Sequence, residues 1–204
     1  RWSVAELVRR HVSLGTPFAM VDARARQVIH GSLALCWVEE VLRGLPREMR
    51  EARALTLATA EARAPFNLEL GPLLRILLVQ LGEEDHVLVV STHHIISDQW
   101  SYGVIARELV KCYNTFCGGK PAPIQPDLPI QYADFAQWQR TWLTGPVLEE
   151  QLAHWKNKLA DLPVLTLPAD RPRLPIHSFK GDQVSLDLSW ALVNRLKQLS
   201  VREG

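Results

Sequence analysis

The sequence predicts an α/β fold in which helices cover a mixed β-sheet. Two apolar runs, at residues 73–81 and 86–92, flank the polar turn GEED at 82–85 and are typical of a buried antiparallel hairpin. Blocks of helix-forming sequence precede and follow this hairpin along the chain. Strands gathered in hairpins, with helices in blocks between them, indicate a mixed sheet covered by helices.

The N-terminal third is predicted to contain a small hairpin and a long helix. Residues 17–21 and 26–29 are short stretches on either side of a polar turn, as in a pair of strands. Residues 47–61 are mostly Arg, Glu, Ala, Met and Leu, which are good helix formers. We expect this helix to lie between Pro46 and Pro65.

A second long helix is expected directly after the central hairpin. Gly118 and Gly119 end it, and the proline-rich residues 118–129 are expected to form an extended connector. The apolar residues of this helix recur every three or four positions and would form one stripe, comprising Trp100, Val104, Ile105, Leu109, Tyr113 and Phe116.

The remaining chain is predicted to contain three helices and one strand. Residues 130–143 and 146–162 have helical patterns, and the proline-rich residues 162–175 form an extended segment. Residues 183–188 alternate strictly between polar and apolar, which predicts a strand before a helix that begins at Ala191. Four aromatic residues at helical spacing are expected in the core: Tyr132, Phe135, Trp138 and Trp142.

The composition excludes several classes of function. Lys and Arg total 23 against 22 Asp and Glu, so a net charge of +1 gives no electrostatic case for binding nucleic acid or an anionic membrane. The apolar runs are too short for a transmembrane helix. The three cysteines form no CxxC pair, which indicates reduced thiols and a cytoplasmic location. Because the chain starts at Arg1 without Met, we expect that it was cut from a longer protein.

The most unusual local feature is THHIISDQWS at residues 92–101, where a predicted strand meets a predicted helix. Loops held between rigid elements often carry active groups. Neighbouring side chains at a strand end point in opposite directions, so His93 and His94 should not face one cavity together. We therefore expect one histidine to work and the other to pack. Asp98, at the start of the helix, can cap amides, orient a ring or hold an arginine.

The residues alone also allow two non-catalytic interpretations of this segment. His94 and Asp98 are four positions apart and could share a helical face as metal ligands, but no third ligand stands at a suitable spacing. No metal site is therefore predicted. The two histidines could also be a structural pair followed by a capping aspartate.

Residues 93–101 resemble the HHxxxDG signature of the condensation domains of nonribosomal peptide synthetases, which are related to chloramphenicol acetyltransferase-type acyltransferases. Residues 10–18, RHVSLGTPF, are similar to the family's RHExLRTxF segment, and residues 132–140 match its YxDFAxW segment closely. Shorter segments also read as in that family and in the same order: PFNL at 65–68, GPLLR at 71–75 and LPADRP at 167–172. The resemblance covers nearly the whole chain.

This resemblance implies a chloramphenicol acetyltransferase-like two-layer sandwich that forms one lobe of a two-lobed domain. Residues 1–181 would be the N-terminal lobe, with its start truncated. Residues 182–204 would be the crossover strand and the start of the C-terminal lobe. Since the family's reaction tunnel runs between the two lobes, we expect the isolated chain to be inactive.

The resemblance also implies an acyltransferase that forms amide bonds. In this family the amine of a carrier-bound aminoacyl thioester attacks a carrier-bound acyl or peptidyl thioester, and an imidazole can accept the proton. The implied partners are donor and acceptor peptidyl carrier domains, the missing C-terminal lobe and a neighbouring adenylation domain. No cofactor is expected on this chain, because the phosphopantetheine arms belong to the carriers.

The resemblance assigns three kinds of site residue. His94 is the catalytic histidine, and His93 and Asp98 hold its loop. The residues expected to bind substrate are Gln99, Trp100 and Ser101. Those expected to be structural are Arg10, Tyr132 and Asp134. The partner expected for Asp98 is either Arg10 or an arginine in the missing lobe.

Three positions depart from the family pattern. Gln99 stands where the signature has Gly, Val12 where Glu is usual, and Gly15 where a second Arg is usual. A Gly at position 99 would leave more room beside the histidine. These departures motivate an alternative function, a degenerate and non-catalytic module that docks a carrier or another enzyme. Elongating, loading and epimerising members of the family all remain open.

Overall fold

The structure is a computed structural model that describes residues 1–29, 35–119, 125–166, 168–171, 176 and 184–204. These residues form two compact units, 1–156 and 157–204. The first unit contains every β-strand of the described ranges, and the second contains the C-terminal helix.

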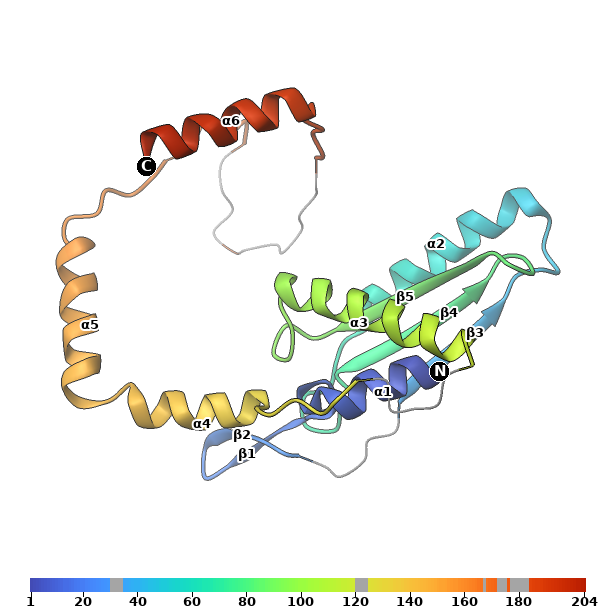
Figure 1. The fold of residues 1–204 in the computed structure, drawn as a ribbon, viewed down its shortest axis with the longest axis horizontal. Helices are drawn as coiled ribbons and strands as arrows, with labels where there is room; N and C mark the ends of the chain where they lie inside the picture. The colour runs from blue at the N-terminus through green and yellow to red at the C-terminus, as the bar shows by residue number, and fades with distance from the viewer. Residues whose placement is uncertain (30–34, 120–124, 167, 172–175, 177–183) are drawn as a thin grey trace. The chain divides into compact units, whose positions relative to one another are not determined.

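A three-stranded mixed sheet forms the centre of the first unit (Figure 1). Its strands are β3 (Cys36–Val41), β4 (Leu74–Gln80) and β5 (His86–Thr92), in the order β3-β4-β5. β3 pairs with β4 in parallel, and β4 pairs with β5 in antiparallel orientation with Leu74 opposite Thr92. The predicted mixed sheet and its central hairpin are confirmed.

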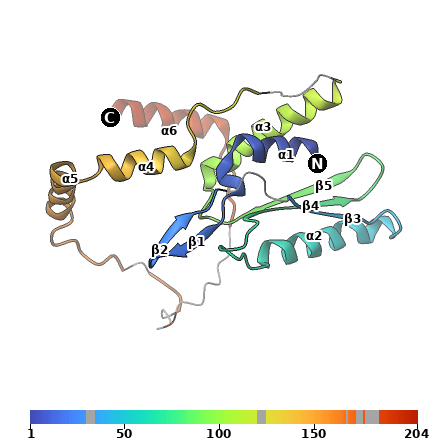
Figure 2. The same cartoon turned by 90° about the horizontal axis from the view of Figure 1, so that it is seen from below.

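One face of the sheet is covered by two helices, α1 (Trp2–Arg10) and α3 (Gln99–Cys117). Figure 2 shows these helices side by side on that face. Because successive strand residues point to opposite faces, Leu74 and Ile76 of β4 meet this layer. They form one buried cluster with residues of both helices, among them Val4, Leu7 and Ile105.

The opposite face packs against α2 (Arg47–Arg63), as Figure 2 also shows. Leu77 and Val79 of β4 lie in a second buried cluster with Ala54 of this helix. The helix starts directly after Pro46 and ends two residues before Pro65, in agreement with the prediction. Helices thus cover both faces of the sheet.

Two elements of the first unit were not predicted, α1 and β3. In α1 the apolar residues Val4, Leu7 and Val8 have helical spacing and all pack in the core, so periodicity could have identified this helix. β3 is harder to recognise because Glu39 and Glu40 interrupt its apolar pattern. A short 3-10 helix, η1 (Val12–Gly15), follows α1.

The small hairpin is confirmed as β1 (Phe18–Val21) and β2 (Arg24–Gln27), paired in antiparallel orientation. Its turn contains two residues, 22 and 23, whereas the expected strands left a turn of four residues, 22–25. Asp22 and Ala23 both have positive φ, at 52° and 57°, which suits the two-residue turns that match the twist of a hairpin.

The predicted burial of the aromatic residues on the next helix is wrong. Helices α4 (Tyr132–Trp142) and α5 (Gly145–Lys158) form where the sequence indicates. The four aromatic side chains of α4, however, are 42–58% exposed. They contact one another along the helix, with Trp138 and Trp142 stacked at 5.3 Å. Helical spacing gathers apolar residues on one face but does not determine what covers that face.

The predicted apolar stripe of α3 is buried only in part. Ile105 lies in the core and Leu109 packs against it, whereas Trp100 is 82% exposed. Tyr113 is exposed as well, and Phe116 stacks on Trp2 at 5.3 Å. The sheet covers a narrower part of the helix than the stripe spans.

The second unit contains α6 (Trp190–Glu203), which starts one residue before the predicted position. Residues 184–188 were predicted as a strand, and this is wrong, because no described strand pairs with them. Residue 183 and the expected lobe boundary at 181–182 lie outside the described residues, as do parts of the two proline-rich segments, at 120–124, 167 and 172–175.

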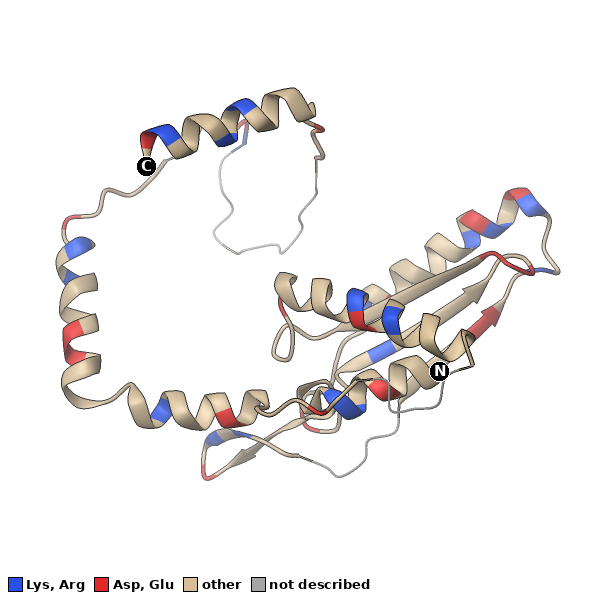
Figure 3. Ribbon diagram, viewed as in Figure 1, with Lys and Arg blue, Asp and Glu red and all other residues tan. Residues whose placement is uncertain are grey.

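Charged residues are distributed over the elements of the structure. Figure 3 shows acidic and basic residues interspersed along the elements. Within the described ranges, no helix is both long enough and apolar enough to cross a membrane. Cys36, Cys112 and Cys117 are all free thiols. Burial raises the pKa of the Cys112 thiol.

Candidate functional site

The two histidines lie in a tight turn between β5 and α3. The His93 amide donates to the carbonyl of Leu73 at 3.1 Å, which extends the β4–β5 ladder by one bond. The Ile96 amide then donates to the carbonyl of His93 at 3.1 Å and turns the chain toward the helix. The loop therefore sits at the edge of the sheet where β4 begins and β5 ends.

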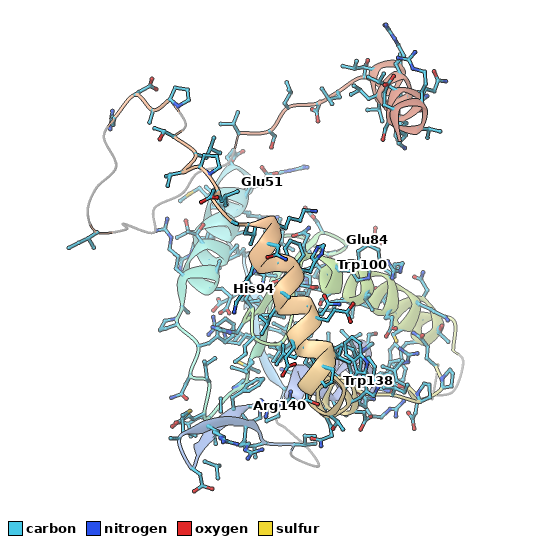
Figure 4. The ribbon with its side chains drawn as sticks, turned by 90° about the vertical axis from the view of Figure 1, so that its left-hand side faces the viewer. Glu51, Glu84, His94, Trp100, Trp138 and Arg140 are labelled. Atoms are coloured by element: carbon cyan, nitrogen blue, oxygen red, sulfur yellow. The ribbon has the colours of Figure 1, made fainter. Side chains whose placement is uncertain are left out.

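The imidazole of His94 is held by the carbonyl of Ser97, with Nδ1 2.9 Å from that oxygen. A carbonyl oxygen can only accept, so Nδ1 carries the proton of the neutral ring. Nε2 then keeps its lone pair and can accept a proton. His94, labelled in Figure 4, is exposed and lines a cavity of about 240 Å³.

His93 is held in the opposite tautomer and contacts different residues. Its Nδ1 accepts from the Ile95 amide at 3.0 Å, so the neutral ring carries its proton on Nε2. The ring is half-buried and meets Phe66 edge to face, with 5.8 Å between ring centroids. His94 therefore faces the cavity while His93 packs, as the alternation of side chains at a strand end predicts.

Phe66 is itself fixed by an arginine that the sequence analysis did not select. The Arg75 guanidinium lies 3.8 Å from the centroid of the Phe66 ring. It also pairs with Glu61 at 2.6 Å and donates to the carbonyls that end α2, those of Glu61, Ala64 and Pro65. Phe66 and Arg75 belong to the PFNL and GPLLR segments, so the family resemblance contained the signal that could have identified them.

Asp98 caps the N-terminus of α3. Its carboxylate accepts from the Ser101 hydroxyl at 2.7 Å and from the Ser101 amide at 2.8 Å, while the Asp98 amide donates to the Ser101 hydroxyl. These two bonds to Ser101, the side-chain bond first, lower the pKa of the Asp98 carboxyl. Asp98 thus fixes the start of the helix that follows the histidine loop.

Arg10, one of the two partners expected for Asp98, pairs with a different carboxylate. Its Nη1 lies 2.6 Å from Glu108 Oε1, and His11 Nε2 lies 2.7 Å from the other oxygen of the same carboxylate. The Arg10 and Glu108 side chains are only 13% and 17% exposed. The pair joins α1 to α3, so Arg10 is structural through a different partner.

The start of α4 is tied to the end of α1 by Gln131. Its side chain donates to the carbonyl of Arg10 at 3.0 Å and accepts from the Val12 amide at 3.2 Å. Asp134 completes the helix cap by accepting from the Gln131 amide at 2.8 Å. These contacts bring Tyr132 into the lining of the His94 cavity, where a purely structural role was expected.

The residues expected to bind substrate have three different positions. Ser101 lines the His94 cavity, and Trp100 lines a neighbouring cavity that also contains His11 and Val104. Gln99 is exposed at the first position of α3 and lines neither cavity. Figure 4 labels the strongly exposed Trp100. The sequence analysis missed seven further lining residues of the His94 cavity: Ser13, Thr16, Phe18, Gln27, Ile95, Ile96 and Ser97.

No metal ligand set is formed in the described part of the chain, where no three His, Cys, Asp or Glu residues come together in a suitable cluster. The site offers an imidazole nitrogen whose lone pair can accept, beside a cavity lined by both polar and apolar side chains. That arrangement can accept a proton from a nucleophile or orient it by a hydrogen bond.

Comparison with known proteins agrees with this geometry. The family described as "Condensation domain" matches residues 1–204. The chain is 46% identical over 203 residues to a linear gramicidin synthase polypeptide of Brevibacillus parabrevis, covering 99% of this chain and 3% of that protein. The starter condensation domain of rhizomide synthetase superposes with a TM-score of 0.71 at 20% identity, covering 80% of this chain and 38% of that chain.

A third similar structure is the X-domain in its complex with OxyB from teicoplanin biosynthesis. It superposes with a TM-score of 0.69 at 30% identity, covering 86% of this chain and 38% of that chain. The present chain thus spans well under half the length of each of these relatives.

The fold is of the chloramphenicol acetyltransferase-like α/β class. The chain belongs to the condensation-domain family, and its relatives in sequence are nonribosomal peptide synthetases. The resemblance seen in the sequence is confirmed, and so is the expected α/β fold with a mixed sheet covered by helices.

Proposed function

We propose that this chain carries the proton-accepting histidine of an amide-forming condensation reaction. The amine nitrogen of a carrier-bound aminoacyl thioester attacks the carbonyl carbon of a carrier-bound acyl or peptidyl thioester. The new C–N bond forms as the C–S bond breaks. The proton lost from the amine passes to His94 Nε2 and then to the departing thiolate, which leaves as a thiol.

The observation that carries this proposal is the tautomer of His94. Its Nδ1 is bound to the carbonyl of Ser97 at 2.9 Å, so Nε2 is the nitrogen that can accept. In His93 the corresponding acceptor, Nδ1, is already occupied by the Ile95 amide. A thioester is an activated acyl group, so alignment of the two reactants and management of one proton supply most of the catalysis that is needed.

The partners follow from this reaction. Donor and acceptor would be carried on phosphopantetheine arms of carrier domains, which are substrates of the site and not residents of this chain. A second lobe would complete the reaction tunnel, and an adenylation domain would load the acceptor carrier. We place the reaction in the cytoplasm, where the free thiols of this chain stay reduced.

The test is amide formation by the natural polypeptide that carries this chain, supplied with a donor acyl-carrier thioester and an acceptor aminoacyl-carrier thioester. Mass spectrometry of the acceptor carrier measures the product. Loss of a general base costs about 100- to 10,000-fold in rate, and His94→Ala should show a loss in that range. The matched control is His86→Ala, an exposed histidine at the other end of β5. Wild-type yield from His94→Ala would contradict the assignment.

We infer a second candidate function, a non-catalytic docking module, from two observations. Gln99 replaces the glycine of the signature at the first position of α3. The similar X-domain has been solved as a complex with another protein, OxyB. Under this alternative the wild-type polypeptide forms no amide and Gln99→Gly restores it. Equal rates in wild type and Gln99→Gly would support ordinary catalysis.

A further inference from the structure

Three hydroxyl groups lie in a row beside the loop that carries His94. Thr92 Oγ1 is 2.6 Å from Ser97 Oγ and 2.7 Å from the Tyr102 hydroxyl. Both distances are typical of O–H···O hydrogen bonds. This hydroxyl row, made of Thr92, Ser97 and Tyr102, links the last residue of β5 to the loop and to the first turn of α3.

Thr92 is the central member of the hydroxyl row. The Ser97 hydroxyl donates to the carbonyl of His93, so Thr92 can donate its proton to Ser97 and accept from Tyr102. Ser97 is only 8% exposed, so its hydroxyl depends on protein partners instead of water. Its other contact, to the carbonyl of His93, is longer at 3.3 Å. Removal of the Thr92 hydroxyl would therefore take away the close partner of a buried group.

Ser97 connects this row to the catalytic imidazole. Its side chain is bound to Thr92, while its main-chain carbonyl accepts from His94 Nδ1. The cap formed by Asp98 and Ser101 fixes the start of α3 without involving Ser97. Ser97 is thus tied to the last residue of β5 by the hydroxyl row, in addition to the loop bonds to the carbonyl of His93.

We propose that Thr92, Ser97 and Tyr102 are positioning residues for His94. By holding the Ser97 carbonyl against Nδ1–H, they keep Nε2 as the proton-accepting nitrogen of the ring. The inference deepens the proposed function and rests on it for its catalytic consequence. It concerns three residues outside the two histidines and the aspartate of the signature.

The first test measures the tautomer of His94 directly. Long-range ¹H–¹⁵N NMR of the chain with ¹⁵N-labelled histidine, at about pH 8.5 where free imidazoles are neutral, reports which nitrogen carries the proton. Thr92→Val removes the hydroxyl and keeps the shape, and it should populate both tautomers of His94. Thr92→Ser keeps the hydroxyl and should retain the wild-type tautomer. An unchanged tautomer in a folded Thr92→Val chain would overturn the proposal.

The second test measures amide formation by the natural polypeptide. Small displacements of a catalytic group cost up to about 100-fold in rate, so Thr92→Val and Tyr102→Phe should lower kcat by about 10- to 100-fold with little change in KM. Thr115→Val is the matched control, because among the described residues the Thr115 hydroxyl bonds within α3, to the carbonyl of Lys111. A fall in kcat equal to that of the control would contradict the positioning role.

The two tests separate this inference from the proposed function. If the wild-type polypeptide forms no amide, the proposed function fails. The tautomer of His94 in Thr92→Val and Thr92→Ser still decides whether the hydroxyl row positions the ring.

Discussion

The histidine loop and helix α4 both contain aromatic rings and a capping aspartate, but they differ in how far the rest of the protein packs against them. In the loop, His93 packs on Phe66, His94 is bound to Ser97, and Asp98 caps the next helix. In α4, Asp134 completes an equivalent cap, yet no residue of the helix is buried. The loop acquires its geometry from neighbours within the first unit, whereas the aromatic face of α4 contacts mainly itself.

This difference shows which sequence signals determine structure locally. Hydrogen bonds between a loop and the elements on either side of it are set by residues a few positions apart. Burial of an apolar face depends on a covering surface that can come from anywhere. The same helical spacing therefore describes a buried face in α1 and an exposed one in α4.

The largest expected effect comes from substitution at the sheet and not at the aromatic helix. Leu77 of β4 is 5% exposed and lies in the buried cluster shared with α2. Leu77→Ala should lower the free energy of unfolding by about 2–5 kcal/mol. Trp138→Ala removes a larger side chain, but its ring is half-exposed and loses mainly stacking, worth about 0.5–1.5 kcal/mol. Urea unfolding measures both. If Trp138→Ala cost as much as Leu77→Ala, the contrast between the two regions would be wrong.

A smaller effect is expected from the ion pair behind the loop. Hydrogen bonds to charged groups contribute roughly 1.5–3 kcal/mol, and Glu108→Gln weakens two of them, those to Arg10 and His11. We expect the free energy of unfolding, measured with urea, to fall by an amount within or below that range. Glu51→Gln, on the exposed part of α2, is the control and should be neutral. Equal midpoints for the two variants would show that the pair contributes nothing.

The smallest expected effect is on the pH dependence of stability, through the Asp98 cap of α3. Because the folded pKa of Asp98 lies below its ordinary value of 3.8, its stabilising contribution is fully present above that pH. The contribution is lost as the pH falls through the lowered folded pKa. Asp98→Ala should therefore lower the midpoint of thermal unfolding at pH 7, and its difference from wild type should shrink toward pH 2. Asp98→Asn keeps the cap and should lose less at pH 7. A difference that grew on acidification would contradict this role.

The elements with strong local signals could be predicted from sequence. The central hairpin, α2 and α3 all have clear patterns and clear ends, such as Pro46 before α2 and Gly118 after α3. The strand expected at residues 183–188 is not formed over the described residues 184–188. Alternation indicates a half-buried strand but supplies no partner for it. β3 was missed because its parallel pairing with β4 is a long-range contact that its own residues do not signal.

The position of the candidate site along the chain could be predicted from sequence, but its contacts could not. The histidine motif identified the loop, and strand alternation predicted that the two rings face different surroundings. The partner of Arg10 could not be predicted, because Glu108 lies 98 positions away along the chain and no local pattern connects the two residues. The tautomers could not be predicted either, because they depend on which backbone groups reach each ring.

The central claim is that the loop holds its two histidines in opposite tautomers and leaves one accepting nitrogen on His94. Long-range ¹H–¹⁵N NMR of the wild-type chain, with His93→Gln and His94→Gln to assign the signals, measures this directly. We predict that the neutral His94 ring carries its proton on Nδ1 and the neutral His93 ring on Nε2. A spectrum in which His94 is protonated on Nε2, or in which both rings share one tautomer, would contradict the account.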